Sequence, residues 1–181
     1  MKNNLILKFS LFFMFFLNFL NASSEELKFE ASSIEIIDRD KIVIAEDGVK
    51  IFSGDEIVID ADKMRYDKEK QFLQANGNIV IKNQAEKIEI FSDIISYDKN
   101  IEKIVSSGNV IIKSDNNYIL RTKEIIYLKN SGEILANYSS KITDNFENEI
   151  EFKQINFNLN NSLLKGKKVK LLDLEKNYYN F

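Results

Sequence analysis

Three aspartates are spaced closely enough in this chain for their carboxylates to act together. Asp60, Asp62 and Asp67 lie close together in the sequence, and such a cluster could bind Ca²⁺ or act in general acid and base catalysis. Asp60 and Asp62 are two positions apart, however, so they share the polar face of one alternating strand. Phe91 and Asp93 hold the same two places in the next copy of an internal repeat. We therefore interpret the aspartates as a solvated strand face and predict no metal site.

The residue types that most often carry out catalysis are missing. The chain contains no histidine and no cysteine, and it also lacks tryptophan. Most nucleophile and base pairs, and the commonest soft metal sites, need histidine or cysteine. We therefore predict that the protein is not an enzyme, that it has no catalytic residues and that it needs no cofactor.

A lysine-rich segment near the C-terminus is the most concentrated basic stretch. It reads Lys165-Gly166-Lys167-Lys168-Val169-Lys170, and Lys165, Lys167 and Lys168 could contact phosphate groups of an anionic ligand. A charged turn and strand face is the alternative interpretation. The chain as a whole is acidic, with 25 basic and 28 acidic side chains, whereas nucleic-acid-binding proteins usually carry the opposite sign. We predict no nucleic-acid partner.

The N-terminal segment 1–22 has the pattern of a signal peptide. Lys2 and Lys8 accompany the uncharged apolar run 11–20, and small residues around Ala22 offer a cleavage site. The run is shorter than the roughly 20 apolar residues that a membrane span needs, so a retained anchor is the alternative. No cysteine follows to form a lipid-modified anchor or a disulfide. We predict cleavage after Ala22, export of the chain, and a fold that packing and strand pairing alone must stabilise.

From Phe29 onward the sequence repeats itself at a period of roughly 30–31 residues, a length typical of stacked repeat architectures. The column that begins at Phe29 contains Phe29, Ile59, Ile90, Leu120 and Ile150, and the column that begins at Ile34 contains Ile34, Met64, Ile95, Ile125 and Ile155. Five copies agree in character, and copies spaced this regularly are expected to stack.

Within each copy, apolar and polar residues alternate, as in the segments 56–61 and 87–92. This alternation is typical of half-buried strands. One step is three positions instead of two, as between Ala61 and Met64, which predicts a bend or bulge that turns a corner. Polar segments such as 66–70 and 97–100 separate the two halves of a copy and predict turns, and Gly77-Asn78 and Gly108-Asn109 predict further bulges or turns.

We therefore predict an all-β fold, a solenoid-like stack of bent antiparallel strands in about five repeats with an apolar inside. The domain is expected to span 29–175, after a short N-terminal segment at 23–28 and before a C-terminal tail at 176–181. Strand edges at the ends of such a stack are unpaired. The first strand, which contains Phe29, Ala31, Ile34 and Ile36, is the expected edge for pairing with a partner strand.

Two phrases of the sequence resemble a known family. Ala61-Asp62 followed by Tyr66-Asp67 and Gly77-Asn78, and the matching residues from Ser92 to Asn109, resemble the OstA-like family of lipopolysaccharide transport. The resemblance covers about residues 29–172. The fourth and fifth copies depart from it, because Tyr127-Leu128 and Phe157-Asn158 replace Tyr-Asp and no Gly-Asn follows.

The resemblance implies an open, twisted β-jellyroll in the periplasm whose apolar interior holds the acyl chains of lipid A. It also implies that such modules join end to end by edge-strand pairing, so the expected partners are lipopolysaccharide, other OstA-like modules and the outer-membrane assembly complex. Two members of the family remain open. The chain is either the freestanding periplasmic bridge protein or the N-terminal periplasmic portion of the outer-membrane assembly protein.

We expect the two apolar columns to line a groove for acyl chains. The expected lining residues are Ile59, Met64, Ile90, Ile95, Leu120, Ile125, Ile150 and Ile155. Repeated aliphatic side chains would offer nearly equal sites along the axis, so a lipid could move along them with little change in free energy. A small outer-membrane β-barrel and a non-enzymatic surface β-repeat binding protein are the alternative functions. The barrel predicts two aromatic girdles, whereas the aromatics here form one column.

Overall fold

The computed structural model describes residues 28–53, 57–84, 87–115, 117–172 and 178–180. Every regular element in these residues is a β-strand, and all fifteen strands belong to one sheet in which neighbours are antiparallel. The all-β prediction is thereby confirmed. The predicted signal peptide and the segment 23–27 lie outside the described residues. Among those residues there is no helix long and apolar enough to span a membrane.

Six long strands form the middle of the sheet, and each is joined to the next by a hairpin. They are β3 (Ile42–Ser53), β4 (Ile57–Asp67), β5 (Phe72–Asn83), β6 (Ile88–Asp98), β7 (Lys103–Ser114) and β8 (Ile119–Leu128). The pairing register shifts halfway along these strands, for example between Asp60 and Lys63 of β4 and between Phe91 and Ile94 of β6. The predicted corner is therefore confirmed, and it divides each long strand into two arms.

The arms belong to two walls that face each other. At the ends of the stack the strands do not continue through the corner, so each wall there is made of separate short strands. One wall contains β2 (Ser33–Ile37), β9 (Glu133–Ala136), β12 (Gln154–Asn158) and β13 (Leu163–Lys167), and the other contains β1 (Lys28–Glu30), β10 (Ser140–Thr143), β11 (Glu149–Phe152), β14 (Lys170–Leu172) and β15 (Tyr178–Asn180).

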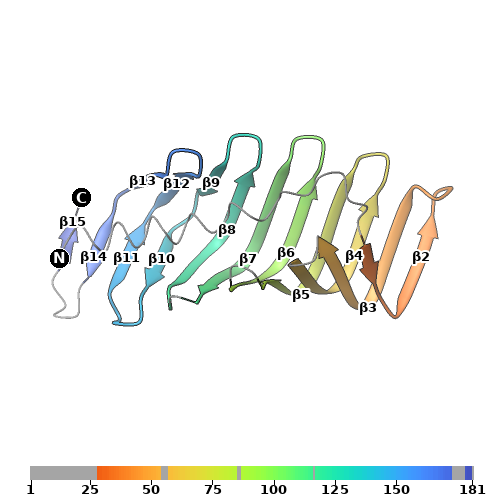
Figure 1. Cartoon of the computed structure of the whole chain (residues 1–181), viewed down its shortest axis with the longest axis horizontal. Helices are drawn as coiled ribbons and strands as arrows, with labels where there is room; N and C mark the ends of the chain where they lie inside the picture. Colours follow the sequence, from red (N-terminus) through yellow and green to blue (C-terminus); the bar gives the residue numbers. More distant parts are fainter. Residues whose placement is uncertain (1–27, 54–56, 85–86, 116, 173–177, 181) are drawn as a thin grey trace.

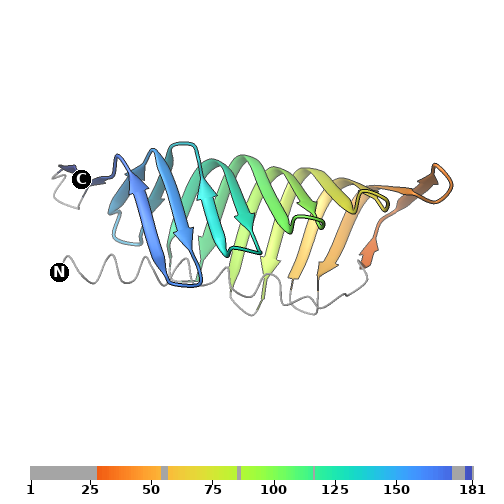
Figure 2. The same ribbon diagram turned by 90° about the horizontal axis from the view of Figure 1, so that it is seen from above.

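The sheet is open. Figures 1 and 2 show the strands stacked side by side along the long axis, with β2 at one end and β15 at the other. No pairing joins β1 or β2 to the strands of the far end in the described residues. An open sheet contradicts the closed alternative considered from the sequence. Within the expected tail at 176–181, Tyr178 and Tyr179 pair with Leu172 and Leu171.

The predicted columns stack rung over rung in both walls. In the wall that contains β1, called the first wall, the register joins Phe29, Ile51, Ile59, Ile81, Ile90, Ile112, Leu120, Ile142, Ile150 and Leu171 in one ladder. In the second it joins Ile34, Ala45, Met64, Ala75, Ile95, Ser106 and Ile125. Large and small side chains alternate in the second ladder, which lets the two walls interlock.

A bracket of three residues, Asp62, Gly77 and Asn78, holds the corner where the family-like phrases occur. Gly77 has a φ of +79°, and the side chain of Asp62 on the neighbouring strand packs directly over it. The amide of Asn78 donates a hydrogen bond to the same carboxylate at 2.8 Å. The next copy repeats this contact, with Asn109 donating to Asp93 at 2.9 Å. The interpretation of Asp62 as a merely solvated residue was therefore incomplete, since its carboxylate fastens the bend.

The fourth copy lacks this bracket, and its strand pairing breaks at the corner. Residues 137–139 separate β9 from β10, where Asn137-Tyr138 replaces Gly-Asn. The hydroxyls of Ser140 and Thr122 form a buried hydrogen bond of 3.0 Å beside the break. The departure from the motif that is visible in the sequence thus marks the place where continuous bent strands give way to separate short ones.

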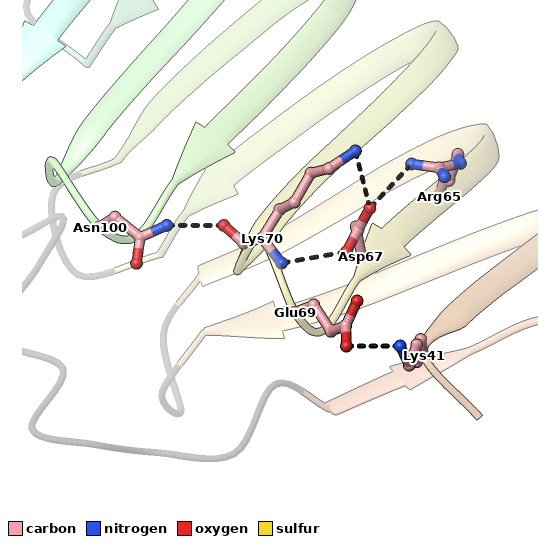
Figure 3. A network of polar contacts seen from close by, with 6 residues as sticks. All are labelled: Lys41, Arg65, Asp67, Glu69, Lys70 and Asn100. Carbon is pink, nitrogen blue, oxygen red and sulfur yellow. Dashed lines mark hydrogen bonds and ion pairs between the residues drawn. The ribbon is translucent and has the colours of Figure 1, made fainter. Parts of the chain in front are cut away.

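The hairpin turns at the outer rim of one wall are stacked and joined by hydrogen bonds (Figure 3). The carboxylate of Asp67 accepts the backbone N–H of Lys70 at 3.0 Å. The amide of Asn100 in the next turn donates to the carbonyl of Lys70 at 2.6 Å. In the last such turn Asn158 takes the place of the aspartate and accepts the N–H of Asn160 at 3.0 Å. The Tyr-Asp phrase therefore caps a turn.

Candidate functional site

The eight predicted lining residues all lie in the apolar interior between the two walls. Ile59, Ile90, Leu120 and Ile150 come from the first wall, and Met64, Ile95, Ile125 and Ile155 come from the second. Met64 and Leu120 have no exposed surface, whereas Ile59 and Ile150 are only partly buried. The structure brings these residues together as predicted.

The interior is filled by its own side chains in this conformation. Between the predicted rungs lie Ile51, Ile81, Ile112 and Ile142, all of them buried. In the sequence these four recur at intervals of 30 or 31 residues, in the second half of each copy. Antiparallel pairing places them in the same ladder as the first column. Every strand therefore contributes a residue to the ladder, and not only every second strand. A ligand that enters this interior must displace contacts between these side chains.

The N-terminal end of the interior is uncovered. Ile34 and Ile36 on β2 are 50% and 54% exposed, because β2 has β3 on one side and no described strand on the other. Phe29 on β1 and Ala31, between β1 and β2, are partly buried against the core. The four residues predicted to form the edge for a partner strand therefore lie together at this end of the stack.

The opposite end also presents free strand edges. In the described part of the chain, β13 pairs only with β12, and β15 pairs only with β14. Leu163 at the start of β13 is 45% exposed. Each end of the stack therefore offers one edge strand per wall, with backbone N–H and C=O groups available to a further strand.

The predicted basic segment is divided by the corner. Lys165 and Lys167 lie on β13, across from Asn156 and Gln154, whereas Lys168 follows the strand with a φ of +51°. Lys168 and Lys170 line an outer cavity of about 330 Å³, but Lys165 and Lys167 do not. The sequence analysis missed the other cations of that cavity, which are Arg121, Lys141 and Lys153. They come from earlier strands and from the corner before β12, so no local signal connects them with the lysine segment.

The tyrosine column is part of the core at the rim of the interior. The register places Tyr66, Tyr97 and Tyr127 in one ladder with Leu73 and Ile104 between them. Burial, assisted by the nearby Glu102 carboxylate, raises the pKa of Tyr97 to about 12. The Tyr97 hydroxyl donates to Glu102 at 3.2 Å. A phenol held in its neutral form stabilises packing and is unsuited to act as a base at neutral pH.

The three aspartates of the candidate cluster point to different partners. Asp60 pairs with Lys50 at 2.5 Å, and Asp62 is held in the corner bracket. Asp67 caps its turn and lies 3.5 Å from the Lys70 ammonium. No cluster of three or more potential metal-ligating side chains occurs among the residues that the structure describes. Each of these carboxylates therefore has a structural partner.

Comparison with known proteins gives a family and likenesses to solved structures. The family model described as OstA-like protein matches residues 25–148. No curated protein sequence matches the chain. The chain is similar to the crystal structure of LptH, the LptA homologous periplasmic component of the conserved lipopolysaccharide transport device from Pseudomonas aeruginosa. That similarity covers 78% of this chain and 82% of the other, with 12% identity and a TM-score of 0.41.

Proposed function

Because the chain belongs to the OstA-like family, we propose that it is a periplasmic module of lipopolysaccharide transport. In this proposal the module shields the acyl chains of lipid A between its two walls and passes them toward the outer membrane. The observation that carries the proposal is the pair of continuous apolar ladders that face each other inside an open sheet. The bridge protein and the periplasmic portion of the assembly protein both remain compatible with it.

The energetics of an acyl chain favour a uniform interior over a single pocket. Burying a chain of about 12 carbons at about 0.8 kcal/mol per CH₂ is worth on the order of 10 kcal/mol. An isolated pocket of that depth would release its lipid slowly. Successive rungs such as Ile81, Ile90 and Ile112 are chemically alike, so displacement by one rung exchanges equivalent contacts. Direction must then come from the neighbours of the module.

Access of the lipid requires an opening motion, and the fold permits one. All backbone pairs of the long strands lie within a wall, and the walls are continuous only at the corner. Parting the free rims therefore disrupts side-chain contacts while the backbone ladders persist. An acyl chain that enters replaces the lost contacts with contacts of the same apolar kind. We propose the corner as the hinge of this motion.

End-to-end pairing is the second element of the proposal. The edges of β1 and β2 at one end and of β13 and β15 at the other are unpaired in the described residues. Pairing these edges between two modules satisfies backbone groups and covers Ile34 and Ile36. It would also extend both apolar ladders into the next module. The expected chain of modules thus offers one continuous apolar path.

Site-specific photo-crosslinking tests the lipid path. A photoreactive residue at Ile90 or Ile125 faces the interior, whereas one at Glu89 or Glu124, the adjacent positions, faces outward. We expect lipopolysaccharide adducts at the inward pair and few at the outward pair in cells that make the protein. Adducts confined to the outward positions, or no adducts at any of the four, would reject the proposal.

A further inference from the structure

A cationic cavity lies on the outer side of the corner near the C-terminal end of the stack. Arg121, Lys141, Glu151 and Lys170 are successive register partners across β8, β10, β11 and β14. They alternate with Leu120, Ile142, Ile150 and Leu171, which form the inward ladder, and they therefore point outward. Lys153 and Lys168 complete the cationic lining from the corner itself.

Most of these cations form no ion pair within the part of the chain that the structure describes. Lys141 is paired with Glu149 at 2.5 Å. Arg121, Lys153, Lys168 and Lys170 make no ion pair with any residue that the structure describes. The single carboxylate of the lining, Glu151, is outnumbered by these four. Like charges gathered around one cavity repel one another, and a bound anion relieves that repulsion.

One residue of the lining is shared with the apolar interior. Phe152 lines the cavity and at the same time belongs to the buried core, with 5% of its surface exposed. The strands are interrupted beside the cavity at 137–139, at Lys153 and at 168–169. In the long strands the corresponding corner is continuous. An amphiphile could therefore place a charged group at this rim while its chains lie between the walls.

We propose that this corner cavity binds the phosphate group of the transported amphiphile. The inference rests on the proposed function and assigns one anchoring point to its ligand. A phosphate group presents several acceptor oxygens, which suit a guanidinium and ammonium groups that converge from different strands. The volume of about 330 Å³ is at the small end of ligand pockets, which suits a headgroup phosphate and leaves the acyl chains to the interior.

The test compares phosphorylated lipid A with its dephosphorylated form, each titrated into the mature chain. The variant Arg121→Gln with Lys168→Gln removes two charges from the cavity and keeps much of the side-chain length. The matched control, Lys165→Gln with Lys167→Gln, removes two charges from β13 outside the cavity. Circular dichroism and thermal unfolding verify that each variant is folded, and Lys170→Gln serves as a second cavity variant.

We expect the cavity variant to bind phosphorylated lipid A at least about tenfold more weakly than wild type, because it loses hydrogen bonds to a charged group. Its binding of the dephosphorylated form should be unchanged. The control should match wild type with both ligands. Equal binding of both ligands by wild type and by the cavity variants overturns the inference and leaves the proposed function standing. Failure of wild type to bind either lipid overturns the proposed function as well.

A titration with inorganic phosphate alone distinguishes the two sources of the anion. We expect inorganic phosphate to bind far more weakly than the phosphorylated lipid, because it gains no contact with the interior. If it binds wild type as tightly as the lipid does, and the cavity variant loses that binding, the site belongs to free phosphate and the headgroup assignment is wrong.

Discussion

The side chain of Asp62 occupies the space directly above the Cα of Gly77 on the neighbouring strand. The Cβ of Asp62 lies 2.9 Å from the position that a Cβ on residue 77 would take. The same relationship recurs between Asp93 and Gly108, where the corresponding separation is 2.7 Å. The Ala-Asp and Gly-Asn phrases of the sequence are therefore the two halves of one contact, brought together by strand pairing at the corner.

This contact predicts a large difference in stability between substitutions at two corner glycines, Gly77 and Gly48. Gly77→Ala should lower the free energy of unfolding by about 2 to 4 kcal/mol, since the new Cβ adds an overlap with Asp62 to the cost of a left-handed backbone. Gly48→Ala is the matched control, because Gly48 has a φ of +82° and no neighbour within 4 Å of the added atom. It should cost only about 1 to 2 kcal/mol. Urea unfolding measures both, and equal losses would contradict the bracket.

The cap of the rim turn between β4 and β5 predicts a pH-dependent contribution to stability. The backbone N–H of Lys70 donates to Asp67, and with the nearby charges of Lys70 and Arg65 it holds the pKa of that carboxyl below its usual value. A lowered pKa in the folded state stabilises the protein above the unfolded value of about 3.9. This contribution is lost as the pH falls through the folded value.

Asp67→Asn should therefore be less stable than wild type at pH 7, and the difference should shrink as the pH falls below about 4. Urea unfolding at several pH values measures it. Glu69→Gln is the control in the same turn, because the Glu69 carboxylate pairs with Lys41 at an exposed site and such pairs contribute little. A difference for Asp67→Asn that grows toward low pH would contradict the assignment.

The raised pKa of Tyr97 predicts that stability also depends on pH in the alkaline range. Burial first, and the Glu102 carboxylate next, raise its pKa to about 12, whereas an unfolded tyrosine ionises near about 10. The neutral phenol is thus favoured by folding, so its contribution is complete below about pH 10 and is lost as the pH rises toward the folded value. Burial also raises the pKa of Tyr118 and Tyr127. Ultraviolet titration should therefore show several late-ionising phenolates in wild type and one fewer in Tyr97→Phe. An unchanged titration curve in the variant would rule out Tyr97 as one of them.

The exposed edge at the N-terminal end predicts concentration-dependent assembly. Ile34→Lys combined with Ile36→Lys places two charges on β2, where any partner strand would have to desolvate them. If modules pair end to end, light scattering should show growth of wild-type particles with concentration and little growth for the variant. Ile101→Lys, at another exposed isoleucine, should behave as wild type. Equal assembly of all three proteins would exclude β2 as a pairing edge.

The hydrophobic pattern alone determined much of this fold. Alternation in segments such as 56–61 made strands the favoured local structure, and the three-position step after Ala61 predicted the corner that the register shift confirms. The constant length of the repeat predicted which residues share a column, because every copy consists of two strands and their turns with the same total length. Local chain geometry was sufficient for these features.

Only the tertiary structure decided which residues of distant segments contact one another. It interleaved Ile51 and Ile81 with Ile59 in one ladder, and it placed Asp62 over Gly77. It also gathered Arg121 and Lys153 around Lys168. Such contacts depend on the register between strands and on how tightly the two walls close. Both are set by packing across the whole stack, and no short stretch of sequence contains that information.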